Sequence, residues 1–136
     1  MSKTVGDLNL DDEHTTVGID DTLQEAALRL LTTSGGIVVV LDDDQHVKGV
    51  IGQRQLIKAL SEGVDAAESQ CHSHMEMDFM KVHLNDRLKG VLKDIKERTP
   101  QAVVAVDENE EFVGYFSPSD YQEAVDLVAN LKGLNL

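Results

Sequence analysis

Strand gives way to helix in the stretch Gly114-Tyr115-Phe116-Ser117-Pro118-Ser119-Asp120-Tyr121. Pro118 has no N–H to donate to a sheet, but it suits the first position of a helix. Ser117 then stands at the N-cap position with Asp120 three residues later, an arrangement that satisfies free N–H groups at a helix start. A hydroxyl and a carboxylate therefore meet at this junction, where they can cap the helix and can also hold a small polar ligand, two roles that are compatible.

Outward from this junction, the sequence repeats itself. Gly49 aligns with Gly114, 65 residues later, and the alignment needs no gap. Eight positions are identical in the two copies: Val17 and Val82, Asp21 and Asp86, Leu23 and Leu88, Val38 and Val103, Val39 and Val104, Asp42 and Asp107, Gly49 and Gly114, Ala59 and Ala124. Copies this small bury little surface alone, so we expect them to pack against each other around a pseudo-twofold axis.

Each copy predicts the order strand, helix, strand, strand, helix. Apolar residues recur at helical spacing after a Thr22–Glu25 capping box, and again from Leu88 to Ile95. Strands are predicted at 14–19, 37–41, 47–51, 102–106 and 112–116, with one more around Val82. The fold class is α+β, two tandem βαββα repeats, with the first repeat at 1–63, a connector at 64–78 and the second repeat at 79–136.

The charge of the chain excludes some classes of partner. The 136 residues include 12 basic and 25 acidic side chains, a formal charge of −13, which disfavours nucleic acid and anionic membranes as partners. The single cysteine cannot form an internal disulfide, and residues 1–14 contain no apolar run typical of a secretory signal. We therefore expect a cytoplasmic protein.

The duplicated pattern resembles the cystathionine-β-synthase (CBS) domain pair, also called a Bateman module, over nearly the whole chain. Residues 20–23 look like the family's helix entry, and residues 38–42 and 103–107 look like its second strand, although both lack the family's proline. Residues 114–120 match its motif of glycine, two hydrophobic residues, Ser or Thr, and Asp three positions later. The resemblance implies a homodimeric regulatory module that is not an enzyme and requires no cofactor.

The resemblance also implies a ligand, an adenosine compound such as AMP, ADP, ATP or S-adenosylmethionine, in a cleft between the copies. In the family the motif aspartate, here Asp120, holds the ribose hydroxyls, and the hydroxyl of Ser117 lies near the phosphate. The residues that the resemblance assigns to this ligand site are Ser117, Asp120, Tyr115, Thr15, Thr16, Gly36, Ile37 and Val38. A phosphate also needs a cation, for which Arg54 is the candidate and Arg29, Lys48, Arg87 and Lys89 are alternatives. Six of these residues have a simpler interpretation: a helix cap for Ser117, Asp120 and Gly36, plain strand residues for the two threonines, and solvated surface for Arg54.

The first copy departs from the motif. Gly52 stands where the hydroxyl should be, and Gln55 stands where the carboxylate should be. Gln55 can still donate and accept hydrogen bonds, but without charge. We therefore predict one competent cleft, which uses Ser117 and Asp120, and a degenerate second cleft at Gly52 and Gln55.

Two alternatives remain from the sequence. The module is a sensor that binds its ligand and signals to a partner protein, or a ligand-free interaction and dimerisation module that uses aliphatic helix faces. A weaker alternative is metal binding at the connector, where Cys71, His72 and His74 are candidate ligands although their spacing matches no standard zinc site. No motif of a known catalytic class occurs in the sequence.

Overall fold

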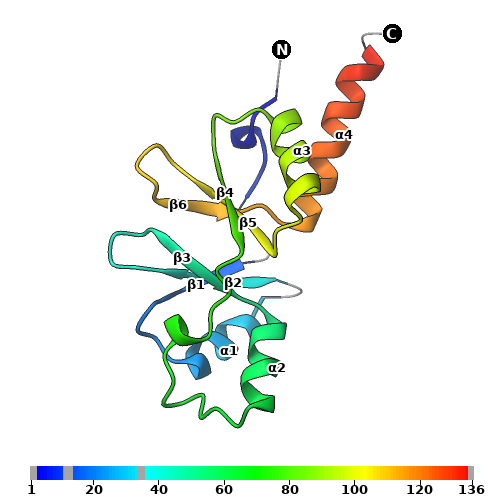
Figure 1. Ribbon diagram of the computed structural model, residues 1–136. Coiled ribbons are helices and arrows are strands. Elements are labelled where there is room, and N and C mark those ends of the chain that lie inside the picture. The colour runs from blue at the N-terminus through cyan, green and yellow to red at the C-terminus, as the bar shows by residue number, and fades with distance from the viewer. Residues whose placement is uncertain (1–2, 11–13, 34–35, 135–136) are drawn as a thin grey trace. The chain divides into compact units, whose positions relative to one another are not determined.

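The computed structural model describes residues 3–10, 14–33 and 36–134, which form two compact units (Figure 1). One unit spans Glu13–Phe79 and contains most of the first copy. Its elements are β1 (His14–Gly18), α1 (Leu23–Leu31), β2 (Ile37–Leu41), β3 (Val47–Ile51), α2 (Gln53–Ser61) and the short 3₁₀ helix η2 (Cys71–Ser73). Ser34 and Gly35, expected to help end the first helix, lie outside the described residues.

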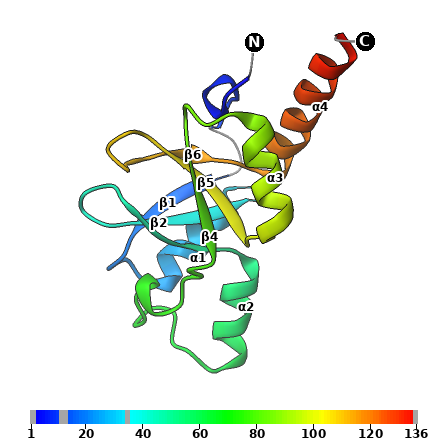
Figure 2. The same cartoon turned by 45° about the horizontal axis from the view of Figure 1, so that its top comes forward.

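The other unit combines Met1–Asp12 with Met80–Leu136. Its elements are η1 (Val5–Asp7), β4 (Phe79–His83), α3 (Leu88–Arg98), β5 (Ala102–Val106), β6 (Phe112–Tyr115) and α4 (Pro118–Leu134). Helices α3 and α4 lie side by side in both views of the ribbon (Figures 1 and 2). No helix in the described part of the chain has the length and apolar character needed to cross a membrane.

Each unit is built on a three-stranded sheet with the first copy ordered β1-β2-β3 and the second β4-β5-β6. In the first sheet β1 runs parallel to β2 and β2 runs antiparallel to β3. The middle strands β2 and β5 are buried along their whole length, as their unbroken aliphatic sequences predict. The α+β class and the repeated order of elements are thus confirmed, with strand ends that differ from the prediction by one residue.

The helix start predicted at Thr22 is confirmed. The Thr22 side chain accepts a hydrogen bond from the backbone N–H of Glu25 at 3.2 Å. This bond satisfies one of the N–H groups that a helix leaves free at its N-terminus. The helix then buries Leu23, Ala26 and Leu30 against the sheet, the apolar stripe that the sequence predicts.

The first twelve residues belong to the unit of the second copy, a grouping that differs from the predicted boundaries of 1–63, 64–78 and 79–136. We call residues 3–10 the N-terminal arm. Its apolar residues Val5, Leu8 and Leu10 are buried in the core of that unit, although the sequence of this region is polar and lacks clear periodicity. The connector is attached to the unit of the first copy in a similar way. Backbone groups within residues 69–76 form hydrogen bonds with the backbone of Leu23, Asp21 and Val50.

The arm and the connector both contact a glycine in the last strand of a hairpin. A Cβ at Gly114 would lie 2.6 Å from both the Cβ and the carbonyl oxygen of Leu10. A Cβ at Gly49 would lie 2.5 Å from the Cγ of Met75. The identity of these two glycines in the repeat therefore has a steric cause, the close approach of a second chain segment.

This contact predicts unequal effects of two matched substitutions. Gly114→Ala pushes against the backbone of Leu10 and should lower the free energy of unfolding by about 1–3 kcal/mol. Gly49→Ala pushes chiefly against a flexible methionine side chain, so its effect should be smaller. Urea denaturation of both variants measures the difference, and equal losses would contradict the steric explanation.

Candidate functional site

The junction that follows β6 brings Ser117 and Asp120 into direct contact. The backbone N–H of Ser117 donates to Oδ2 of Asp120 at 2.9 Å, and the Ser117 hydroxyl donates to the same oxygen at 3.0 Å. The backbone N–H of Asp120 donates in return to Oγ of Ser117 at 3.1 Å. Both residues are buried, with 1% and 4% of their surface exposed. This reciprocal pattern is a capping box, so the capping interpretation of these residues is correct for this structure.

A cavity of about 270 Å³ opens beside this cap, within the unit of the second copy. Tyr115 and Ser117, two of the predicted ligand residues, line it. The other lining residues are not among the predicted ligand residues: Ile95, Pro100, Gln101, Ala102, Val103, Phe116, Pro118 and Tyr121. The order of elements in the sequence could have identified these residues. They lie at the end of α3, at the entry to β5 and at the junction between β6 and α4.

The first copy builds the same cap with different atoms. The backbone N–H of Gly52 donates to Oε1 of Gln55 at 2.8 Å, the counterpart of the bond from Ser117 to Asp120. Gly52 has no hydroxyl, so the second and third bonds of the Ser117–Asp120 cap have no counterpart here. A neutral amide is therefore sufficient to start the helix. The carboxylate and the hydroxyl of the second copy exceed what capping requires.

The remaining predicted ligand residues lie in the unit of the first copy. Thr15 and Thr16 are in β1, where they pair with Val38 and Val39 of β2. Val38 is completely buried in the hydrophobic core and is paired with strands on both sides, so neither its side chain nor its backbone is exposed to a ligand in this structure. Gly36 and Ile37 precede and begin β2, and Arg54 is exposed on α2.

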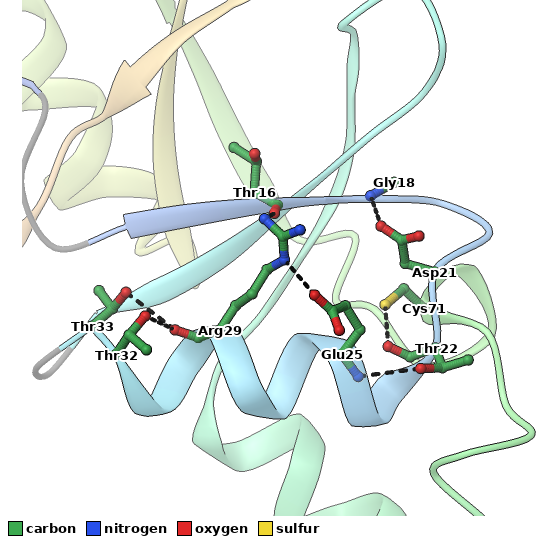
Figure 3. A network of polar contacts seen from close by, with 9 residues as sticks. All are labelled: Thr16, Gly18, Asp21, Thr22, Glu25, Arg29, Thr32, Thr33 and Cys71. Atoms are coloured by element: carbon green, nitrogen blue, oxygen red, sulfur yellow. Dashed lines mark hydrogen bonds and ion pairs between the residues drawn. The ribbon is translucent and has the colours of Figure 1, made fainter.

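The backbone carbonyl of Thr16 is already bonded to an arginine (Figure 3). Nη1 of Arg29 donates to this carbonyl at 3.0 Å, while Nε of Arg29 forms an ion pair with Glu25 at 3.0 Å. The aligned positions of the second copy are Lys81, Asp94 and Gly90, which cannot reproduce the network. The hydrogen bond of Arg29 therefore links α1 to β1 in the first copy, and the aligned residues of the second copy do not form an equivalent link.

The connector residues proposed as metal ligands are not grouped. Cys71 is completely buried, and its Sγ donates to the backbone carbonyl of Thr22 at 3.4 Å (Figure 3). His72 is exposed, with Nε2 bonded to the side chain of Gln70 at 2.7 Å. In the described residues, Cys71, His72 and His74 do not form a set of donor atoms close enough to share an ion.

A different set of donors does come together in the hairpin turn of the first copy. Asp42, Asp44 and His46 place one donor atom each within 4.8 Å of one another. Backbone N–H groups of His46 and Asp44 donate to Asp42, and the bond from His46 is the main cause that lowers the pKa of this carboxyl group. These bonds are those of a polar turn, which explains the cluster without an ion.

Burial also changes the chemistry of the single thiol. Loss of solvent raises the pKa of Cys71 to about 11, and the nearby charge of Asp21 contributes in the same direction. At pH 8 the thiolate fraction should therefore be about one in a thousand, compared with about one in ten for a thiol with a pKa of 9. A thiol in this state is a poor metal ligand and a poor nucleophile.

We expect iodoacetamide to modify Cys71 about a hundredfold more slowly in the native protein than in urea at pH 8. Because folding raises the pKa of Cys71, there is a pH range in which the thiol stays protonated in the folded protein and is already ionised in the unfolded chain. The free energy of unfolding should thus fall as the pH rises from about 9 to about 11. Mass spectrometry of the alkylated protein measures the rate, and equally fast native alkylation would contradict the buried position of the thiol.

The family model of the CBS domain matches residues 5–62. No curated protein matches the sequence.

Solved structures resemble the whole chain. A CBS domain pair/ACT domain protein from Thermotoga maritima has a TM-score of 0.73 at 21% identity, covering 92% of this chain and 98% of its own. A CBS domain-containing protein of unknown function from Bacillus anthracis has a TM-score of 0.75 at 19% identity, covering 90% and 92%. A CBS-domain containing protein from Agrobacterium tumefaciens has a TM-score of 0.68 at 25% identity, covering 89% and 97%. Residues 5–62 therefore match the model of the CBS domain, and the chain has, over most of its length, the fold of a CBS domain pair.

Proposed function

We propose that this protein is a regulatory module of the cytoplasm that binds an adenosine-containing ligand beside Ser117 and Asp120. CBS domain pairs are generally regulatory rather than catalytic, which supports this class of function. The observation that carries the proposal is the cavity next to the cap. Ser117 lines this cavity, and its buried hydroxyl is bonded to the buried carboxylate of Asp120, which does not itself line the cavity. The equivalent junction of the first copy has neither group.

The chemistry of the junction suits such a ligand. A carboxylate can accept hydrogen bonds from two neighbouring ribose hydroxyls, and these bonds are strengthened by its charge. A phosphate is attracted by the N–H groups and the partial positive charge at a helix N-terminus, here the start of α4. The rings of Tyr115 and Tyr121 line the same cavity and offer apolar surface to a base or sugar.

The size of the cavity bears on how much of the ligand it holds. The cavity volume of about 270 Å³ is slightly below the range of volumes that is typical of sites that enclose a small molecule. We infer that this unit supplies part of the ligand site. A contribution of Thr15, Thr16, Gly36, Ile37, Val38 and Arg54 to a ligand site stays a prediction of the CBS resemblance.

Ligand binding regulates only if it favours one shape of the protein over another. An adenosine ligand would stabilise the shape that it binds more tightly, by the difference between its affinities for the two shapes. A partner protein that distinguishes these shapes would then receive the signal.

The first copy provides a control for the test of this proposal. The double substitution Ser117→Gly with Asp120→Gln gives the second junction the residues that already cap α2. We expect the variant to fold, because an amide at this position still accepts from the helix-start N–H. We expect it to lose binding of AMP, ATP and S-adenosylmethionine, measured by isothermal titration, while the wild type binds one ligand per chain.

Two outcomes of the titration would count against the proposal. Undiminished binding by the variant would show that Ser117 and Asp120 are caps and nothing more. Two equal sites on the wild type would contradict the predicted difference between the copies. The substitution Gln55→Ala serves as a second control, because it weakens a cap of the other unit and should leave the affinity nearly unchanged.

A second candidate function, self-association, is favoured by the exposed faces of α1 and α2. Leu31 and Leu60 are 83% and 78% exposed, and Leu28 and Ile57 are also exposed. A groove of about 380 Å³ lies between these helices and is lined by five aliphatic residues and by Gln53. The two helices carry three cations and one carboxylate, so this face does not share the net negative charge that would repel a second copy of the chain.

We therefore propose a homodimer formed through this face, and sedimentation equilibrium tests it. Leu31→Glu should convert the dimer to monomers at micromolar concentration, because it places a charge in a desolvated apolar contact. Lys96→Glu at the aligned position of α3 is the matched control and should leave the dimer intact. A wild type that remains monomeric at the concentrations of the titration would exclude this dimer.

A further inference from the structure

The N-terminal arm is bonded to the strand that leads into the proposed ligand site. The backbone N–H of Tyr115, near the end of β6, donates to the carbonyl oxygen of Leu10 at 3.1 Å. Leu10 is buried, and its backbone lies against Gly114, where there is no room for a side chain. Since Tyr115 lines the cavity and Ser117 follows two residues later, the arm holds the backbone at the edge of the site.

The rest of the arm is fastened at the opposite end of the same unit. Val5 and Gly6 donate backbone hydrogen bonds to the carbonyls of Asp86 and Leu84, at 3.0 and 2.9 Å. The backbone N–H of Leu88, the first residue of α3, donates to Lys3 at 2.9 Å. The arm therefore connects the start of α3 with the end of β6.

The side chains of the arm share a core with the site. Val5, Leu8 and Leu10 belong to the same hydrophobic cluster as Val103 and Phe116, both of which line the cavity. Close-packed interiors transmit displacement, because a residue in a filled core cannot move without its neighbours. Docking of the arm and the shape of the cavity thus depend on the same contacts.

We propose that Leu10 is a positioning residue for the ligand site and that docking of the arm and occupation of the cavity are coupled. This inference rests on the proposed function. The coupling is reciprocal by thermodynamic necessity: if the docked arm raises the affinity for the ligand, the ligand stabilises the docked arm by the same factor.

The position of the arm in the sequence gives this coupling a direction. Leu10 is separated by three residues from His14, the first residue of β1 in the other unit. A ligand at Ser117 would thus act on a segment that continues directly into the first strand of the first copy. The connector has the equivalent place there, where Val50 and Glu76 exchange two backbone hydrogen bonds of 3.0 and 2.7 Å.

The test combines ligand titration with hydrogen exchange measured by mass spectrometry on the full chain. In the wild type, AMP should slow the exchange of a peptide that covers residues 3–10, although no residue of the arm lines the cavity. Leu10→Ala should weaken AMP binding by about fivefold or more, the lower end of measured couplings. Leu10→Met, which restores a long apolar side chain, should recover most of the affinity.

The matched control is Met75→Ala, which removes the equivalent contact of the connector with Gly49 in the other unit. It should leave the affinity for AMP within about twofold of the wild type, because distant and independent sites contribute additively. ATP and S-adenosylmethionine are titrated in parallel with every variant.

The outcomes separate this inference from the proposed function. If the wild type binds AMP, but neither the exchange of the arm nor the affinity of Leu10→Ala changes, the coupling is wrong and the ligand site stands. If none of the three ligands binds to the wild type, both proposals fail. A loss of affinity that is equal in Leu10→Ala and Met75→Ala would indicate general destabilisation and would also overturn the coupling.

Discussion

In both copies of the repeat, the N–H group just before the last helix donates to a side chain three residues later. This bond fixes the point at which the chain leaves the sheet, because a buried helix start without such a partner would leave polar groups unsatisfied. The acceptor is Gln55 in the first copy and Asp120 in the second. The rest of each junction depends on it, including the position of the following helix and, in the second copy, the cavity beside Ser117.

A second constraint is the edge of each sheet. Strands β3 and β6 are edge strands, whose free backbone groups would otherwise be open to pairing with another chain. The connector, which precedes the second copy, forms hydrogen bonds with β3 of the first copy at Val50. The N-terminal arm, which precedes the first copy, forms a hydrogen bond with β6 of the second copy at Tyr115. Both edge strands have a glycine at this contact, Gly49 in β3 and Gly114 in β6, and the missing side chain lets the covering segment approach. The chain thus uses the same device twice, and in the second copy it adjoins the candidate site.

Much of the fold follows from the sequence because its signals are local. Helix starts at Thr22 and Ser117, the aliphatic runs of β2 and β5 and the offset between Gly49 and Gly114 all identify elements without knowledge of the tertiary structure. The arm was not predicted, because Val5, Leu8 and Leu10 are too few and too irregular to form a helical or strand pattern. Their burial depends on contacts with residues more than seventy positions away, such as Asp86 and Tyr115. The cap between Ser117 and Asp120 follows from the local sequence and is compatible with a second role in ligand binding. The cavity beside it depends on Pro100 and Tyr121, whose proximity is a tertiary property.

The central claim is that Ser117 and Asp120 hold a ligand in addition to capping α4. A crystal structure of the protein grown with saturating AMP tests it most directly. The account predicts ligand density beside the Ser117 hydroxyl and the Asp120 carboxylate, and none at Gly52 and Gln55. An empty cavity at Ser117, or AMP bound only elsewhere on the molecule, would contradict it.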